Sequence, residues 1–206
     1  MKNKYKILLI SVFCIIAILA IVAVIYFTTD KSEKKETIKV LESLDGFPYV
    51  LKENDSKLEK DLFYELEKVL SEKEIDNQVY AELIAQLFVV DVFSLDNKLN
   101  KYDIGGLEFI LNTEQEKFKN LMSDSLYDVI QNNYDGKRKQ ELPAVNSVKV
   151  NECTEGKITF DNEELLAYDI ILEWTYEKDL GYDTSASLKI MKKDNLMYVV
   201  SYNPEK

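Results

Sequence analysis

The chain of 206 residues contains no histidine. Histidine is the commonest general base, the usual zinc ligand and the simplest pH sensor, so any such role must fall to other side chains. Cysteine is almost absent too: Cys14 lies inside an apolar segment and Cys153 far along the chain, so no disulfide can form within the soluble part. Serine nucleophile elbows, phosphate-binding glycine loops and paired-cysteine metal motifs are also missing. No motif therefore fixes a reaction, and none indicates a cofactor.

Positive charge is in the minority, with 26 basic against 37 acidic residues and a formal net charge of −11. The first 28 residues carry Lys2, Lys4 and Lys6 and no acid, so the rest of the chain has a net charge of −14. Nucleic acids and anionic membrane surfaces require a basic footprint on the protein. We therefore expect a soluble acidic domain that does not bind nucleic acid. The single arginine and many lysines are typical of an AT-rich bacterial genome.

One long apolar segment is present. Residues Ile7 to Phe27 are interrupted only by Ser11 and Tyr26, and as a helix they would span about 31 Å, enough to cross a bilayer. Tyr26 and Phe27 lie where an aromatic belt belongs. A cleaved signal peptide is the alternative, but the apolar core is longer than such a signal and no small-x-small cleavage site follows it. The segment predicts an uncleaved transmembrane anchor.

The anchor predicts four regions: a cytoplasmic tail (1–6), a transmembrane helix (7–27), a stalk or linker (28–54) and a soluble α+β domain (55–206). Lysines flank the apolar segment on both sides in nearly equal number, so the charge rule alone does not decide the orientation. We favour a domain outside the cytoplasm of a single-pass cell-membrane protein, because a short basic tail is typical of exported bacterial proteins.

Three segments of the domain predict helices. The first is amphipathic, with apolar positions at Leu58, Leu62, Leu66 and Val69. The second, residues 78–95, is apolar around most of its circumference, which predicts burial on most sides. A third begins near Thr113, with Glu116 as capping-box partner, and continues to Ile130. Between the last two helices, Gly105 and Gly106 predict a tight bend.

After Pro143 the apolar period changes from about 3.6 to 2, which predicts strands. Alternating apolar residues indicate five strands, at residues 148–150, 158–160, 168–176, 188–190 and 196–202. Asp194 and Asn195 predict a hairpin turn between the last two. Helices followed by antiparallel strands predict an α+β domain in which the helices cover one face of the sheet.

This order of elements, with Trp174 on a long strand and a strand at the end of the sequence, resembles the nuclear transport factor 2-like superfamily over residues 58–203. The resemblance implies a cone-like domain in which a curved antiparallel sheet wraps around a helix. With its short tail and single anchor, the chain also resembles the bitopic scaffold subunits of type IV secretion and conjugation machines. In those proteins the domain is an assembly part outside the membrane. No interface residue can be assigned from this resemblance.

A cone-like fold would bring aromatic residues to its concave face. We interpret these residues, with one acid, as a candidate pocket: Asp91, Tyr168, Trp174, Tyr176, Tyr198 and Tyr202. Asp91 is included because it interrupts an apolar helix, and buried carboxylates are enriched at functional sites. The simpler interpretation makes the aromatic residues plain core, and places Asp91 on the solvated side of its helix or in a bond to the backbone near the bend.

Two groups of charged residues allow both a functional and a structural interpretation. Four acids lie close together in sequence: Asp91, Asp96, Asp103 and Glu108. Their spacing does not match an EF-hand, so we attribute their proximity to chance rather than to a metal site. Lys137, Arg138 and Lys139 form the only dense basic stretch of the domain. They could meet an acidic partner or lipid headgroups, but we expect them to complement a helix dipole.

Two functions follow from these features. The first is a membrane-anchored, non-enzymatic protein-interaction or assembly component of the cell envelope. It rests on the anchor and on a domain without a catalytic signature. The second is a domain that binds a small ligand, or acts on one, in the aromatic pocket with Asp91 as acid or base.

Overall fold

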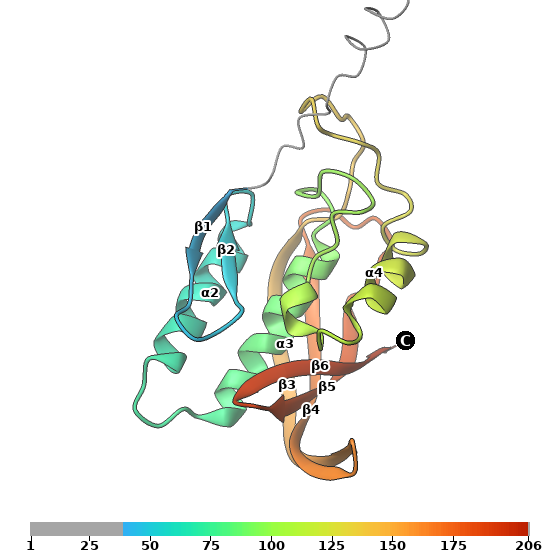
Figure 1. Ribbon diagram of the computed structural model, residues 1–206. Coiled ribbons are helices and arrows are strands. Elements are labelled where there is room, and N and C mark those ends of the chain that lie inside the picture. Colours follow the sequence, from blue (N-terminus) through green and yellow to red (C-terminus); the bar gives the residue numbers. More distant parts are fainter. Residues whose placement is uncertain (1–38, 206) are drawn as a thin grey trace, which may run out of the picture. The chain divides into compact units, whose positions relative to one another are not determined.

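The computed structural model of the protein describes residues 39–205, which form an α+β fold (Figure 1). The elements are β1 (Val40–Ser43), β2 (Val50–Lys52), α2 (Lys57–Leu70), α3 (Asn77–Phe93), the 3-10 helix η1 (Leu107–Phe109), α4 (Gln115–Ser123), β3 (Val145–Phe160), β4 (Glu163–Tyr176), β5 (Ser185–Lys193) and β6 (Leu196–Pro204). β1 pairs with β2, and β3 to β6 form one antiparallel sheet in sequential order. The predicted class, three helices with a curved antiparallel sheet, is confirmed.

Helix α3 packs against all four strands of the large sheet and against α2 (Figure 1). Its apolar residues face both neighbours, so nearly every position from Tyr80 onward is buried. The sheet meets it with alternating side chains. Along β4, Ile170 and Leu172 are fully buried, whereas Asp169 and Glu173 on the other face are exposed. The core therefore lies between α3 and one face of the sheet, and the other face is solvated.

The first two helices begin at side-chain caps. Ser56 Oγ accepts a hydrogen bond from the backbone N–H of Glu59 (3.1 Å), and Asp76 Oδ1 accepts one from the N–H of Gln78 (3.0 Å). Such caps satisfy backbone donors that the first turn of a helix leaves free. Both helices were predicted within two residues of their observed bounds.

The third helix is shorter than predicted. α4 begins at Gln115 after Glu114, so the predicted cap at Thr113 is wrong, and it ends at Ser123 rather than at Ile130. The chain leaves the helix because the N–H of Tyr127 bonds back to Met122 O (2.9 Å). This turn carries the Tyr127 side chain into the core, and that packing overrides the helical pattern.

The strands also differ from their prediction. The two short strands expected at 148–150 and 158–160 are one strand, β3, which contains a bulge between Val150 and Glu152. The turn at Asp194 and Asn195 is confirmed, because both residues have positive φ (51° and 64°), as a two-residue hairpin turn requires.

A second bulge changes which residues of β6 face the helices. Pairing with β5 shifts between Lys189 and Ile190, so one residue of β6 is inserted without a partner. Before the bulge Met197 and Val199 are buried, and after it the ring of Tyr202 packs at a tilt against Phe93 of α3, with ring centroids 5.6 Å apart. A bulge shifts the alternation by one residue. Tyr198 and Tyr202, predicted on one face, therefore lie on opposite faces.

Residues 40–52 were predicted as part of a linker that extends to residue 54, but they form the β1–β2 hairpin of the folded domain. Leu44, Tyr49 and Leu51 are buried in the core. The hydroxyl oxygens of Tyr49 and Tyr80 lie 2.6 Å apart and share a hydrogen bond. The apolar residues of this stretch are irregularly spaced, and Gly46 and Pro48 interrupt them, which is why its burial was missed.

Within residues 39–205 no helix is both long enough and apolar enough to cross a bilayer. The predicted cytoplasmic tail, the anchor at residues 7–27 and the linker as far as residue 38 lie outside the described residues.

Candidate functional site

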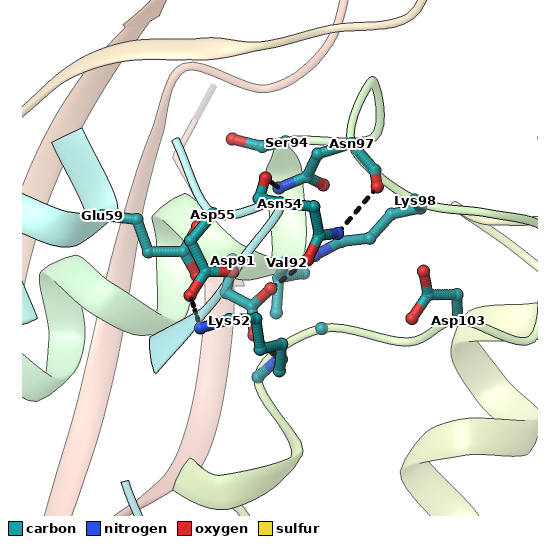
Figure 2. Close-up of polar contacts among 12 residues, drawn as sticks. Lys52, Asn54, Asp55, Glu59, Asp91, Val92, Ser94, Asn97, Lys98 and Asp103 are labelled. Atoms are coloured by element: carbon teal, nitrogen blue, oxygen red, sulfur yellow. Dashed lines mark hydrogen bonds and ion pairs between the residues drawn. The ribbon is translucent and has the colours of Figure 1, made fainter. Parts of the chain in front are cut away.

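The most unusual feature of the domain is a buried cluster of charged residues (Figure 2). Asp91, near the end of α3, is only 2% exposed, and Lys98, in the loop that follows, is 4% exposed. Lys98 Nζ donates a short hydrogen bond to Asp91 Oδ1, and Lys52 Nζ of β2 lies 3.6 Å from Asp91 Oδ2. The N–H of Gly106 donates to that same oxygen (2.7 Å). One carboxylate thus joins three segments of the chain.

Two glycines allow the loop to pass close to Asp91. A Cβ atom at Gly105 would lie 2.2 Å from the backbone oxygen of Asp91, and one at Gly106 would lie 2.6 Å from Val92 Cγ2. Gly106 also has a φ of +74°, which side chains disfavour. The N–H of Gly105 donates to the Tyr127 hydroxyl (3.1 Å), which in turn donates to Val92 O (2.8 Å). The predicted bend is therefore confirmed, and it closes the cluster.

The two lysines determine the charge of Asp91. Burial alone would raise the pKa of this carboxyl, but Lys98 and Lys52 hold the pKa well below its usual range. Burial likewise works against charge on Lys98, and Asp91 reverses this, so the pKa of Lys98 is raised. Both groups are therefore ionised at neutral pH.

Two glutamates near this pair behave differently. Burial, aided by the negative charge of Asp91, raises the pKa of Glu59 to about 8 and that of the half-buried Glu108 to about 7. Glu59 Oε2 has no hydrogen-bond partner within residues 39–205, which fits a neutral carboxyl better than a charged one. Burial also raises the pKa of Asp55, although its Oδ2 accepts a bond from the N–H of Lys52 (2.6 Å).

Loops close the same end of the domain over the cluster. Asn54 Nδ2 donates to Asn97 O (3.0 Å), and Asn97 Nδ2 donates to Asn54 O (3.4 Å), which ties the segment after β2 to the loop after α3 (Figure 2). Arg138 donates to Lys98 O (2.8 Å) and Asp96 O (2.6 Å) through its guanidinium. The predicted dipole interaction is therefore wrong for this arginine, because α4 ends far upstream and Arg138 fastens loops.

The second feature is an apolar groove between α3, α4 and β6, with a volume of about 780 Å³. Buried side chains form its floor: Phe88, Val92, Phe93, Ile110, Met122 and Val199. Leu121 of α4 lies at the rim and is 63% exposed. The ring of Phe118 packs on Phe88 at 6.0 Å, so α4 forms one wall of the groove rather than filling it.

The six predicted pocket residues do not come together in one site. Asp91 lies in the charged cluster, and only Tyr202 lines the groove. Tyr168 and Trp174 are buried core residues, and Tyr198 is half-buried on the other face of β6. Tyr176 links two neighbours: its hydroxyl accepts from Trp174 Nε1 (2.9 Å) and donates to Asp183 O (2.8 Å).

The four neighbouring acids also separate. Asp103 lies apart from Asp91 (Figure 2), and its Oδ2 accepts a hydrogen bond from the N–H of Leu99 (2.8 Å). Asp96 is exposed, and Glu108 is half-buried. In the part of the chain described by the structure, no group of three or more acidic or cysteine side chains is arranged to hold a metal ion.

Sequence reasoning found Asp91 but missed its partners Lys98 and Lys52 and the nearby buried Glu59. The glycine pair after Asp91 was the available signal, because two glycines beside a buried acid indicate a backbone that approaches it closely. The lysines carry no comparable signal in a chain with 26 basic residues. Comparisons with protein-family models, with curated proteins and with solved structures find no match to this chain.

Proposed function

We propose that this protein is a membrane-anchored, non-enzymatic interaction or assembly component of the cell envelope, and that the groove beside α4 is its contact surface. The observation that carries the proposal is the groove itself: an apolar space of about 780 Å³ between α3, α4 and β6, with Leu121 exposed at its rim. Exposed apolar surface of this kind marks binding sites in soluble domains.

The charged cluster supports this assignment. The buried ionisable side chains Asp91, Lys98 and Glu59 are absent from the lining of the groove. A catalytic site places its perturbed groups in the cleft that holds the substrate. Here Asp91 and Lys98 fasten a loop away from the groove, and the groove is mainly apolar, so it is suited to binding.

The proposal includes the expectations for the rest of the chain. Residues 7–27 cross the membrane, residues 1–6 are cytoplasmic, and the domain lies outside the cytoplasm with protein partners. The domain is cone-like and akin to the nuclear transport factor 2-like superfamily, as in the scaffold subunits that the chain resembles. The length of the apolar segment and the order of helices and strands support these points.

A photocrosslinking amino acid at Leu121 tests the proposal in intact cells. Val129 is the matched control, because it is an apolar residue of the same region, 51% exposed, that does not line the groove. We expect protein adducts of defined mass from position 121 and none of them from position 129. If position 121 gives no protein adduct while the protein is folded and present, the proposed function is wrong.

The size of the groove favours one second candidate, the binding of a small apolar ligand. Its volume of about 780 Å³ lies within the range of small-molecule sites, about 300–1,000 Å³, and Phe93 and Tyr202 offer aromatic surface in it. Mass spectrometry of the purified full chain under non-denaturing conditions separates the two. A molecule that leaves when Leu121 is replaced by aspartate would favour this second function.

A further inference from the structure

The groove is apolar, but its charges are unevenly distributed. Only Glu114, Lys117 and Asp183 are charged among the residues that line it. Lys117 Nζ lies 3.9 Å from Glu114 Oε2, so this neighbouring pair adds no net charge to the groove. Asp183 is exposed, and within residues 39–205 no lysine or arginine lies within 4.0 Å of its carboxylate. The groove therefore offers one uncompensated negative charge.

The fold fixes the position of this charge. Asp183 O accepts the hydrogen bond of the Tyr176 hydroxyl, which is held by the indole N–H of the buried Trp174. Asp183 Oδ2 lies 3.5 Å from the hydroxyl of Tyr202, whose ring packs at a tilt against Phe93 in the groove. A carboxylate thus stands at the edge of an aromatic wall.

We infer that the occupant of the groove is a segment of a partner protein that places an apolar side chain on the floor and a lysine or arginine beside Asp183. This inference rests on the proposed function and specifies its partner class. The net charge of −14 beyond the first 28 residues would also attract such a segment over a longer range.

Other occupants fit these observations less well. A second copy of the chain would bring an equally acidic surface to the groove, and the like charges would repel. A purely apolar small molecule would make no use of Asp183. A basic, amphipathic segment satisfies both the floor and the carboxylate.

Peptide binding tests the inference on the full chain in nanodiscs of zwitterionic phosphatidylcholine, with empty nanodiscs as background. Two short fluorescent peptides of leucine and alanine are used, which differ only in carrying lysine or glutamate. Fluorescence anisotropy gives both affinities. We expect the lysine peptide to bind more tightly than the glutamate peptide. Leu121→Asp should weaken the binding of the lysine peptide about tenfold or more, because the leucine side chain that the bound peptide would bury is lost. Val129→Asp should change it by no more than about twofold.

Reversal of the charge at position 183 provides a more discriminating test of the inference. Asp183→Lys should invert the preference, so that the glutamate peptide binds more tightly. Asp124→Lys is the matched control: it makes the same change in net charge at an exposed position next to α4 that does not line the groove, and it should preserve the preference for lysine. Unchanged thermal unfolding verifies that each variant is folded.

Several results would overturn the inference. These are equal binding of the two peptides, no binding of either, or an Asp124→Lys variant that behaves like Asp183→Lys. Self-association in sedimentation that Leu121→Asp abolishes would assign the groove to a second copy instead. If the peptides fail while position 121 still crosslinks to other proteins in cells, the partner class is wrong but the proposed function stands. If that crosslinking fails as well, both are wrong.

Discussion

The carboxylate of Asp91 and the ammonium group of Lys98 form an ion pair that is almost sealed from solvent, and the two residues belong to different structural elements. The pair joins the end of α3 to a loop that has no regular structure of its own. If one partner of a buried ion pair is removed, the other is left as an uncompensated buried charge. This charge lowers the free energy of unfolding by far more than the intact pair contributes to it. The domain therefore folds stably only when this loop places Lys98 beside Asp91.

Replacement of Lys98 by methionine should lower the free energy of unfolding by about 3–5 kcal/mol, because Asp91 then keeps the Gly106 N–H bond but only the more distant Lys52 as a positive charge. Urea denaturation of the full chain measures this change. The double variant Asp91→Leu/Lys98→Met should recover much of the loss, since no buried charge remains from the pair. A double variant as unstable as the single one would show that the pair stabilises the fold by more than mutual compensation.

Glu59 should make stability depend on pH. Its pKa is about 8 in the folded protein against an ordinary value of 4.5, because it is buried and close to Asp91 and Asp55, while Lys98 and Lys52 act in the opposite direction. The folded state therefore favours the protonated form. This contribution to stability is complete below about pH 4.5 and is lost as the pH rises through about 8.

The unfolding free energy should accordingly fall between these limits, by up to about 1.4 kcal/mol for each pH unit. Glu59→Gln should flatten this part of the profile. Glu65→Gln, at an exposed position of the same helix, is the control and should leave the profile as in the unaltered chain. A Glu59→Gln variant with the original slope would assign the pH dependence to other groups, among them Glu108.

Gly105→Ala should destabilise the protein by about 2 kcal/mol or more, because the new methyl group would meet the backbone of Asp91, which cannot move aside within α3. Gly156→Ala is the control, since a Cβ atom there has no neighbour within 4 Å. Differential scanning calorimetry should show a lower Tm for the first variant only. Equal Tm values for both would mean that the loop can retreat from the helix.

Arg138→Lys should loosen the loops above the cluster although it keeps the charge. A lysine cannot reproduce the planar donor set that bonds the carbonyl groups of Asp96, Lys98 and Gln131. Hydrogen exchange should accelerate at the N–H of Asn133, which donates to Leu99 O. The exposed Lys139→Gln variant should not change that rate. Faster exchange in both would point to net charge rather than to the lost bonds.

The proposed orientation in the membrane can be tested with a thiol, but Cys153 is unsuitable. It is half-buried, and burial together with the carboxylate of Glu82 raises its pKa to about 12, so little reactive thiolate forms. Tyr102, which is 74% exposed, is a better position. A Tyr102→Cys variant without the native thiols should react with an impermeant maleimide in intact cells. Reaction only after lysis would place the domain in the cytoplasm and end the envelope proposal.

The prediction of the fold succeeded where one period dominates a long segment. α2 and α3 carry capping residues and clear apolar spacing, and the turn at Asp194 carries its own backbone preference. The prediction failed where a contact between residues that are distant in the sequence determines the local structure. α4 ends early because Tyr127 turns inward to Val92, and the β1–β2 hairpin is stabilised by Tyr80, distant in the sequence.

The candidate site was predictable only in part for the same reason. An acid within an apolar helix identified Asp91, but a lysine in a polar loop looks the same whether it is buried or not. The bulge in β6 also places Tyr198 and Tyr202 on opposite faces of the strand, and no residue type in the sequence predicts such a bulge. Pocket membership depends on that register, so it could not be derived from alternation alone.

The β1–β2 hairpin has a mechanical consequence for the domain. Val40 pairs with Lys52, and the N–H of Glu53 bonds Lys39 O, so the first residues after the linker are fastened directly beside the lysine that approaches Asp91. A pulling force applied at residue 39 loads these bonds before it reaches α3 or the sheet. The charged cluster is thus the first internal structure to experience such a pull, whereas the groove is built on the later elements α3, α4 and β6.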